Sequence, residues 1–144
     1  EIRPRAVSTF LNARPAGTQD LWQARLYLLK PLIRLTLAAL WLASGLLGLT
    51  SPAASFTPGL PLTEPLAITL ARAFGALDLA LGLALLRNWR PGPVALTQIA
   101  LVLAYTAGLT LLAPALWLDP YGSLLKNLPV LALMLVHLAL VEER

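Results

Sequence analysis

Four long apolar stretches, separated by short polar segments, make up most of this chain. They cover about residues 32–50, 66–86, 94–114 and 124–141. Each is close to the roughly 20 residues that an α-helix needs to cross about 30 Å of hydrocarbon. The runs are continuous, whereas the strands of a membrane barrel would alternate between apolar and polar residues over ~10 positions. The pattern therefore predicts four membrane-spanning helices.

The segments between these stretches have the composition of turns. Proline, glycine, serine and asparagine punctuate residues 51–65, 88–93 and 119–123, and these residue types favour turns over helix. Short connections force neighbouring helices to run antiparallel. The predicted fold is therefore an all-α, up-down bundle of four helices, with residues 32–144 as its transmembrane domain.

The first part of the chain has ordinary polarity. Residues 1–20 are predicted to form a linker or tail, and Asp20 is placed to cap a short helix over residues 21–31. This helix would mix aromatic and basic side chains, which is typical of a segment at the lipid headgroups. Alternatively, these residues are the first turns of the following span, and Pro31 fits either arrangement. The absence of an initiator methionine predicts a fragment or a processed product.

The composition supports a membrane protein and excludes several kinds of site. Of the 144 residues, 58% are hydrophobic and 12% are charged, whereas a soluble domain carries about 25% charged residues. The chain has no cysteine and one histidine, His137, which excludes disulfides, iron–sulfur clusters and bis-histidine haem. No metal site is predicted. The net charge of +4 comes without a basic patch interleaved with aromatic residues, so nucleic acid is not a predicted partner.

The basic residues predict the orientation of the bundle. Arg25 and Lys30 precede the first span and Arg87 and Arg90 follow the second, whereas the opposite loops carry only acidic charges. Because positively charged short loops remain in the cytoplasm, both termini are expected there. The predicted location is a multi-pass position in a membrane such as the bacterial inner membrane.

Asp78 is the residue that most requires an explanation. It lies near the middle of the second span, where a carboxylate costs at least ~2.5 kcal/mol unless it is protonated, paired or in a polar interior. Counting ~1.5 Å per residue from the cytoplasmic end places Asp78 at a depth of roughly 12 Å and Tyr105 and Thr106 at roughly 17 Å. A hydrogen bond from Tyr105 or Thr106 to Asp78 is therefore feasible.

Other polar residues of the spans fall into two further layers. The layer within about 6 Å of the cytoplasmic edge comprises Arg34, Gln98 and His137. The layer toward the opposite edge comprises Arg72, Thr110 and Lys126.

These layers allow two interpretations. In the functional one, a cavity for a quinone or a lipid substrate is lined by Asp78, Tyr105, Gln98, His137 and Arg34. In the structural one, the same groups bond one another and fix the helix register, each contact contributing about 0.6 kcal/mol. No catalytic residue is assigned in either case.

Small residues recur four positions apart, as in Ser44 and Gly48 and in Ala71 and Gly75. Such pairs let helix backbones approach closely. They predict helix packing but identify no oligomer, so a homo-oligomer stays open as a partner.

Three runs, residues 25–49, 76–86 and 98–136, resemble the DoxX-like family, most specifically from Tyr105 to Pro129. The resemblance implies a four-span membrane domain that often forms the carboxyl-terminal part of a longer protein. The front half of such proteins resembles a short-chain dehydrogenase with a Rossmann domain. The resemblance also implies an association with quinone-linked redox reactions.

The resemblance places any NAD(P) site in a preceding cytoplasmic domain or subunit, since this chain has no GxGxxG between a strand and a helix. The leading hypothesis is a membrane anchor and accessory module of an oxidoreductase, with no cofactor of its own beyond a candidate quinone. The second hypothesis is a purely structural or assembly protein. A small transporter or channel is a weaker third, because the spans show no inverted repeat.

Overall fold

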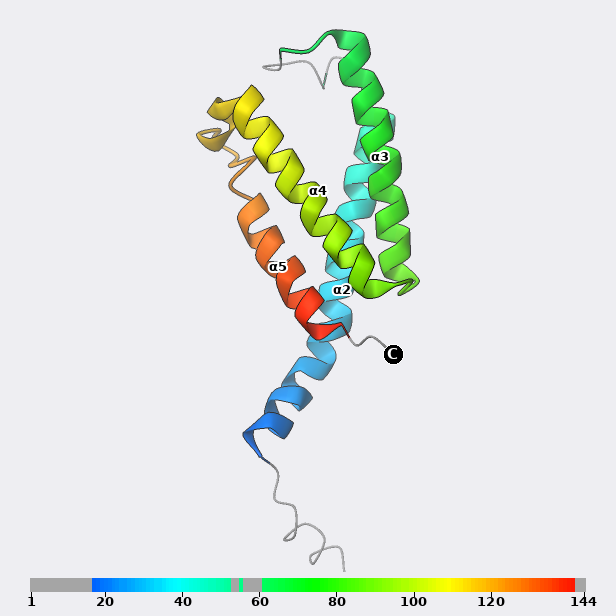
Figure 1. The fold of residues 1–144 in the computed structure, drawn as a ribbon, viewed down its shortest axis with the longest axis vertical. Coiled ribbons are helices and arrows are strands. Elements are labelled where there is room, and N and C mark those ends of the chain that lie inside the picture. Colours follow the sequence, from blue (N-terminus) through cyan, green and yellow to red (C-terminus); the bar gives the residue numbers. More distant parts are fainter. Residues whose placement is uncertain (1–16, 53–54, 56–60, 142–144) are drawn as a thin grey trace, which may run out of the picture. The chain divides into compact units, whose positions relative to one another are not determined.

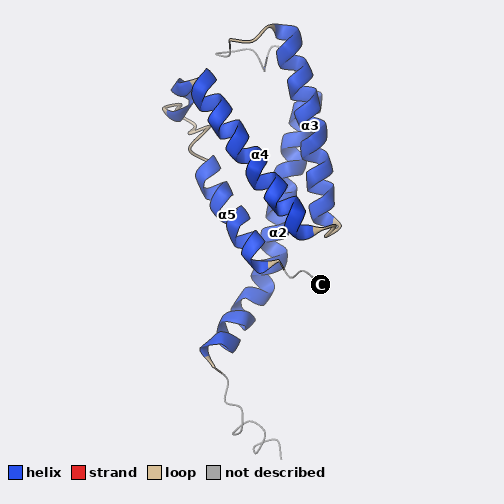
Figure 2. Ribbon diagram, in the orientation of Figure 1, coloured by secondary structure: helices blue, strands red, loops and turns tan. Residues whose placement is uncertain are grey.

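The computed structural model describes residues 17–52, 55 and 61–141. Throughout this part of the chain the secondary structure is helical, without strands (Figure 2). The elements are α2 (Thr18–Thr50), α3 (Glu64–Leu86), α4 (Pro91–Leu112), the short 3₁₀ helix η2 (Pro114–Trp117) and α5 (Asn127–Leu140) (Figure 1). The prediction of an all-α fold is confirmed. Residues 1–16, the first part of the predicted linker or tail, lie outside the described residues.

Helix α2 is continuous through Pro31. Of the two alternatives for residues 21–31, the structure has the one in which they are the first turns of a long helix. Asp20 acts near the start, where its carboxylate accepts a hydrogen bond of 2.8 Å from the backbone N–H of Gly17, as the acidic residue of a capping box does. The proline removes one backbone donor, and the leucine-rich sequence on both sides of it favours helix.

The chain divides into two compact units, residues 1–32 and residues 33–144. The described part of the first unit is the amino-terminal portion of α2. The second unit contains the rest of α2 and the helices α3, α4 and α5, and successive helices in it run antiparallel (Figure 1). This is the up-down order that the short connections predict.

Helix α3 begins two residues before the predicted second span and ends with it at Leu86. The turn that follows it is tight, because Asn88 and Arg90 adopt left-handed backbone angles with φ of 52° and 42°. Helix α4 then starts at Pro91, where the fixed φ of proline suits a first helical position.

The predicted fourth span, residues 124–141, is wrong in extent. Helix α5 has 14 residues, which gives a length of about 21 Å, too short to cross about 30 Å of hydrocarbon. The chain before α5 forms turns, with Gly122 at φ 62°. A helix from residue 124 would place Pro129 in its interior, whereas a start at Asn127 leaves this proline in the first turn, where no backbone donor is needed. The third span is shifted toward the amino terminus, since α4 begins at Pro91, three residues before the predicted start, and ends at Leu112, two residues before the predicted end.

Three of the described helices, α2, α3 and α4, are long and apolar enough to cross a membrane. Between 22% and 28% of the residues in their most apolar stretches are buried, so most apolar side chains face outward. A small core joins the helices of the second unit and includes Leu37, Trp41, Leu85, Val102 and Met134. Exposed leucines outnumber this core, which is the arrangement expected when lipid rather than water is the solvent.

Helices α2 and α3 approach closely at three glycines. A Cβ atom added to Gly45 would lie 2.8 Å from the carbonyl oxygen of Gly75, and one added to Gly48 would lie 2.9 Å from the Cα of Gly75. Only residues without a side chain permit this distance between backbones. The contact fixes the position of α3, and therefore of Asp78 one turn further along, against α2.

Candidate functional site

Three helices meet at the carboxylate of Asp78, which is 4% exposed on α3. The Ser44 hydroxyl on α2 donates a hydrogen bond of 2.6 Å to Oδ2. The Tyr105 hydroxyl on α4 donates a longer one, 3.3 Å, to Oδ1. Each carboxylate oxygen thus has a partner from a different helix, and the desolvation of the acid is offset by two hydroxyl donors.

The contact between Tyr105 and Asp78 is one of the two that the depth estimate made feasible. The other candidate, Thr106, instead donates to the carbonyl of Val102 at 2.7 Å and accepts from the side-chain amide of Asn127 at 2.8 Å. Sequence reasoning missed Ser44 as a partner of Asp78. The signal was present, because Ser44 belongs to the small-residue pattern of α2 and Asp78 follows Gly75 by one turn.

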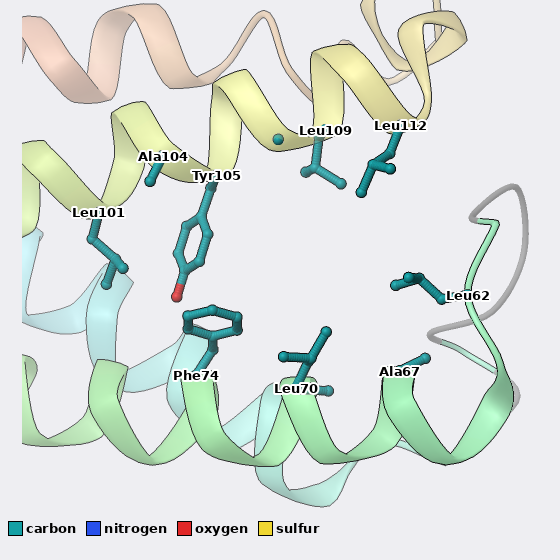
Figure 3. A pocket seen from close by; sticks show the side chains of 11 residues that line it. Leu62, Ala67, Leu70, Phe74, Leu101, Ala104, Tyr105, Leu109 and Leu112 are labelled. Atoms are coloured by element: carbon teal, nitrogen blue, oxygen red, sulfur yellow. The ribbon is translucent and has the colours of Figure 1, made fainter.

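A pocket of about 380 Å³ lies between α3 and α4. Figure 3 shows Leu62, Leu70 and Phe74 on one side of it, facing Leu101, Tyr105 and Leu109 on the other. Its remaining lining residues are Ala67, Ala71, Ala104, Gly108 and Leu112. The volume falls within the ~300–1,000 Å³ of small-molecule sites. Among these described lining residues, Tyr105 is the one with a polar group on its side chain.

Tyr105 connects this pocket to Asp78. Its ring stands edge-on to Phe74, with ring centroids 5.1 Å apart and an interplanar angle of 89°. This geometry is favourable for an aromatic pair and holds the tyrosine across the end of the pocket (Figure 3). The ring therefore forms part of the apolar wall while the hydroxyl group bonds the carboxylate.

The three cytoplasmic-layer residues of the predicted cavity do not line this pocket. Gln98 is fully buried and His137 is 7% exposed. Gln98 lies between Val94 and Val102 at four-residue spacing, so it belongs to the face of α4 that packs into the core. The structure thus brings Asp78 and Tyr105 together and places Gln98 in a different environment.

Unpaired polar atoms distinguish that second environment. Both side-chain polar atoms of Gln98, Nε2 of His137 and Nε of Arg34 are buried without a hydrogen-bond partner. Gln98 lies on α4, His137 on α5 and Arg34 on α2. An unpaired buried polar group costs about 1–3 kcal/mol, so these three side chains differ from the satisfied network around Asp78.

The predicted outer layer is divided among separate contacts. Arg72 donates to the backbone carbonyls of Gly48 and Ser51 at 2.8 and 3.0 Å, which caps the end of α2. Thr110 accepts a hydrogen bond of 3.0 Å from Nε1 of Trp117, which attaches η2 to α4. Lys126 is exposed just before α5. These partners give Arg72 and Thr110 structural roles.

The pocket between α3 and α4 is suited to the binding of a small molecule. In the part of the chain that the structure describes, no group of three or more histidine, cysteine or acidic side chains is placed to hold a metal ion. The pocket combines an apolar wall with one hydroxyl group from Tyr105, which suits a largely apolar ligand with a small polar head.

Comparison with known proteins supports the resemblance found in the sequence. The model of the DoxX-like family matches residues 38–135, more than half of the chain and a range that contains Ser44, Asp78, Tyr105 and the whole pocket lining. No curated protein and no solved structure matches this chain.

Proposed function

This chain belongs to the DoxX-like family, and we propose that it is a multi-pass membrane domain that binds a lipid-soluble ligand between α3 and α4. The family and the three long apolar helices indicate a membrane protein. The excess of basic residues before the first span and after α3 supports a cytoplasmic side for the amino terminus and for the turn between α3 and α4. A carboxyl terminus on the same side, which we also propose, requires η2, the following turns and α5 to return across the bilayer together, because α5 alone is about 21 Å long.

The pocket is the observation that carries the proposal. Leucines and alanines of α3 and α4, with Leu62 just before α3, line a half-open volume of about 380 Å³. In a membrane, the molecules most abundant around such a space are apolar. Tyr105 adds a fixed polar contact at one end of the pocket. An apolar chain with one polar head, as in a quinone or another isoprenoid or acyl lipid, matches both properties.

We further propose that the domain serves as the membrane anchor and accessory module of a redox enzyme. The chain has no cysteine, and its side chains supply no electron-transfer centre. Redox function would therefore require a bound carrier such as a quinone, together with a cytoplasmic dehydrogenase domain or subunit that holds NAD(P). The lining of the pocket supports only the part of this proposal that concerns a lipid-soluble bound carrier.

A substitution that fills the pocket tests ligand binding. A Cβ atom at Gly108 would meet nothing within 4 Å, so Gly108→Leu places a side chain in the pocket without a clash at its first atom. Ala107→Leu is the matched control, because Ala107 is an exposed neighbour on the same helix and does not line the pocket.

The probe is decylubiquinol, kept in its reduced form, and its equilibrium binding is measured on the purified protein in lipid nanodiscs. Saturable one-to-one binding is expected for the wild type and for Ala107→Leu. A loss of at least about tenfold in affinity is expected for Gly108→Leu, since a leucine side chain occupies space that the ligand needs. Equal binding by all three proteins, or no saturable binding to any, would show that the pocket is not a ligand site.

The structural alternative has one observation in its favour. Both oxygens of Asp78 are hydrogen-bonded within the protein, so the acid by itself requires no ligand. A protein that served only assembly would give no saturable binding of the probe, and Asp78 would then act solely to hold α2, α3 and α4 together.

A further inference from the structure

We infer that the pocket selects ligands whose polar head donates a hydrogen bond, such as an alcohol or a phenol, over ligands whose head can only accept one. This inference rests on the proposed function, because it names the ligand class of the same pocket. It follows from the hydrogen-bond direction at Tyr105 and from the lining of the pocket.

The hydroxyl proton of Tyr105 is already used in a hydrogen bond within the protein. A phenol hydroxyl has one hydrogen to donate and lone pairs with which to accept, whereas an ionised carboxylate only accepts. The Tyr105 hydrogen is used in the bond to Oδ1 of Asp78. What Tyr105 retains for a ligand is therefore its capacity to accept a hydrogen bond.

The surroundings of Asp78 keep the Tyr105 hydroxyl directed toward the carboxylate. Ser44 already occupies Oδ2, and the carboxyl group is 4% exposed, so no solvent replaces Tyr105 at Oδ1. Turning the hydroxyl toward a ligand would leave a buried carboxylate oxygen unpaired, which is more costly than the loss of an ordinary exposed hydrogen bond. The edge-on contact with Phe74 also restrains the ring.

The lining of the pocket determines which other groups a ligand head could meet. Among the described residues that surround the pocket, Tyr105 is the one with a polar side chain. A ligand hydroxyl can donate to the phenol oxygen, whereas an ether or carbonyl oxygen would face lone pairs and find no side-chain donor among these described residues. Applied to a redox carrier, the same rule favours a hydroquinone over its quinone.

A matched pair of probes isolates the head group. Dodecanol and dodecyl methyl ether have the same alkyl chain, but only the alcohol has a donor. Their affinities for the wild-type protein in nanodiscs are compared after correction for the partition of each probe into the lipid. Dodecanol is expected to bind about three- to tenfold more tightly, the ratio that one net hydrogen bond supplies.

Two variants test the assignment of the proton. In Tyr105→Phe the pocket keeps its apolar wall and loses its acceptor, so the alcohol-to-ether ratio is expected to fall to about one. In Asp78→Ala the hydroxyl of Tyr105 no longer has its acceptor and becomes free to donate, so the ether is expected to gain relative to the alcohol. If Asp78→Ala does not fold, the Tyr105→Phe ratio alone decides.

The outcomes separate this inference from the proposed function. Equal affinities of the two probes in the wild type, with binding still abolished by Gly108→Leu, would overturn the donor preference and leave the ligand pocket standing. A preference that persists in Tyr105→Phe would also overturn it, because the selectivity would then arise elsewhere. The absence of saturable binding of either probe would overturn both.

Discussion

The hydroxyl of Tyr105 on α4 donates to the carboxylate of Asp78 on α3 across 3.3 Å, in the same unit in which Ser44 on α2 donates to the other oxygen across 2.6 Å. One buried acid thus joins three helices. It also holds the hydroxyl end of Tyr105, which lines the pocket, so we expect helix packing and ligand selection to depend on the same acid.

The first prediction concerns the stability contributed by this acid. Asp78→Ala removes the acceptor of both hydroxyls, and interhelical hydrogen bonds in membranes contribute about 0.6 kcal/mol on average and up to about 1.7 kcal/mol. A loss of about 1–2 kcal/mol in unfolding free energy is expected in mixed-micelle unfolding. Asp78→Asn keeps a hydrogen-bonding group at the position and should lose less.

The control for this prediction is Glu64→Gln at the exposed first turn of α3, where a change within about 0.5 kcal/mol is expected. An unfolding free energy of Asp78→Ala equal to that of the wild type would mean that the network does not stabilise the bundle.

The second prediction contrasts two glycines. A Cβ atom at Gly45 would lie 2.6 Å from Cγ of Leu79 and 2.7 Å from its backbone nitrogen, so Gly45→Ala forces α2 and α3 apart. Overpacking of this kind costs about 1–3 kcal/mol. Gly108→Ala meets nothing within 4 Å and should stabilise α4 by up to about 1 kcal/mol through helix propensity.

Both values come from the same unfolding titration in mixed micelles. The unfolding free energy is expected to fall in Gly45→Ala and to rise in Gly108→Ala, and this opposite sign tests the contact at Gly45. Destabilisation by both substitutions in equal measure would argue against a specific contact between α2 and α3 at Gly45.

The third prediction contrasts two side-chain amides. Gln98 is fully buried with both polar atoms unpaired, so Gln98→Met removes unsatisfied groups at nearly constant volume and is expected to be neutral or to stabilise by about 1 kcal/mol. Asn127 donates to Thr106 at 2.8 Å, so Asn127→Leu is expected to destabilise by about 0.6–1.7 kcal/mol.

Thermal unfolding followed by circular dichroism measures both variants against the wild type. A marked destabilisation by Gln98→Met would contradict this prediction and would mean that the amide has a partner in the folded membrane protein.

The fourth prediction concerns Pro31, which lies inside α2. Pro31→Ala restores the missing backbone donor and removes the ring, and proline in a helix interior is about 3 kcal/mol less favourable than alanine. Greater stability and equal or higher helicity are expected from circular dichroism. A loss of helicity would indicate that the proline starts a separate helix, as the sequence alternatively allowed.

The hydrogen bond between Asp78 and Tyr105 could be predicted from the sequence, because the depth of both residues in the membrane follows from counting along helices of known rise. The hydrogen bond between Ser44 and Asp78 could not be predicted in this way, because it depends on how closely the backbones of α2 and α3 approach at Gly45 and Gly75. The depth estimate grouped Asp78, Tyr105, Gln98, His137 and Arg34 in one cavity, and of these five residues Tyr105 alone lines the pocket between α3 and α4. Depth orders residues along the bundle axis but leaves their direction around each helix undefined.

The sequence by itself determined that the chain is helical, rich in exposed apolar residues and a member of the DoxX-like family, because the backbone hydrogen bonds of a helix are local and an apolar run needs no partner to be recognised. It did not determine that α5 is only 14 residues long, nor which polar side chains meet. Leucines lie both in the core and on the exposed surface of these helices, so periodicity does not separate the lipid-facing side from the packed side. Only the rotation and separation of the helices in the tertiary structure placed Tyr105 in the lining of the pocket, Asp78 between Ser44 and Tyr105, and Gln98 outside the pocket.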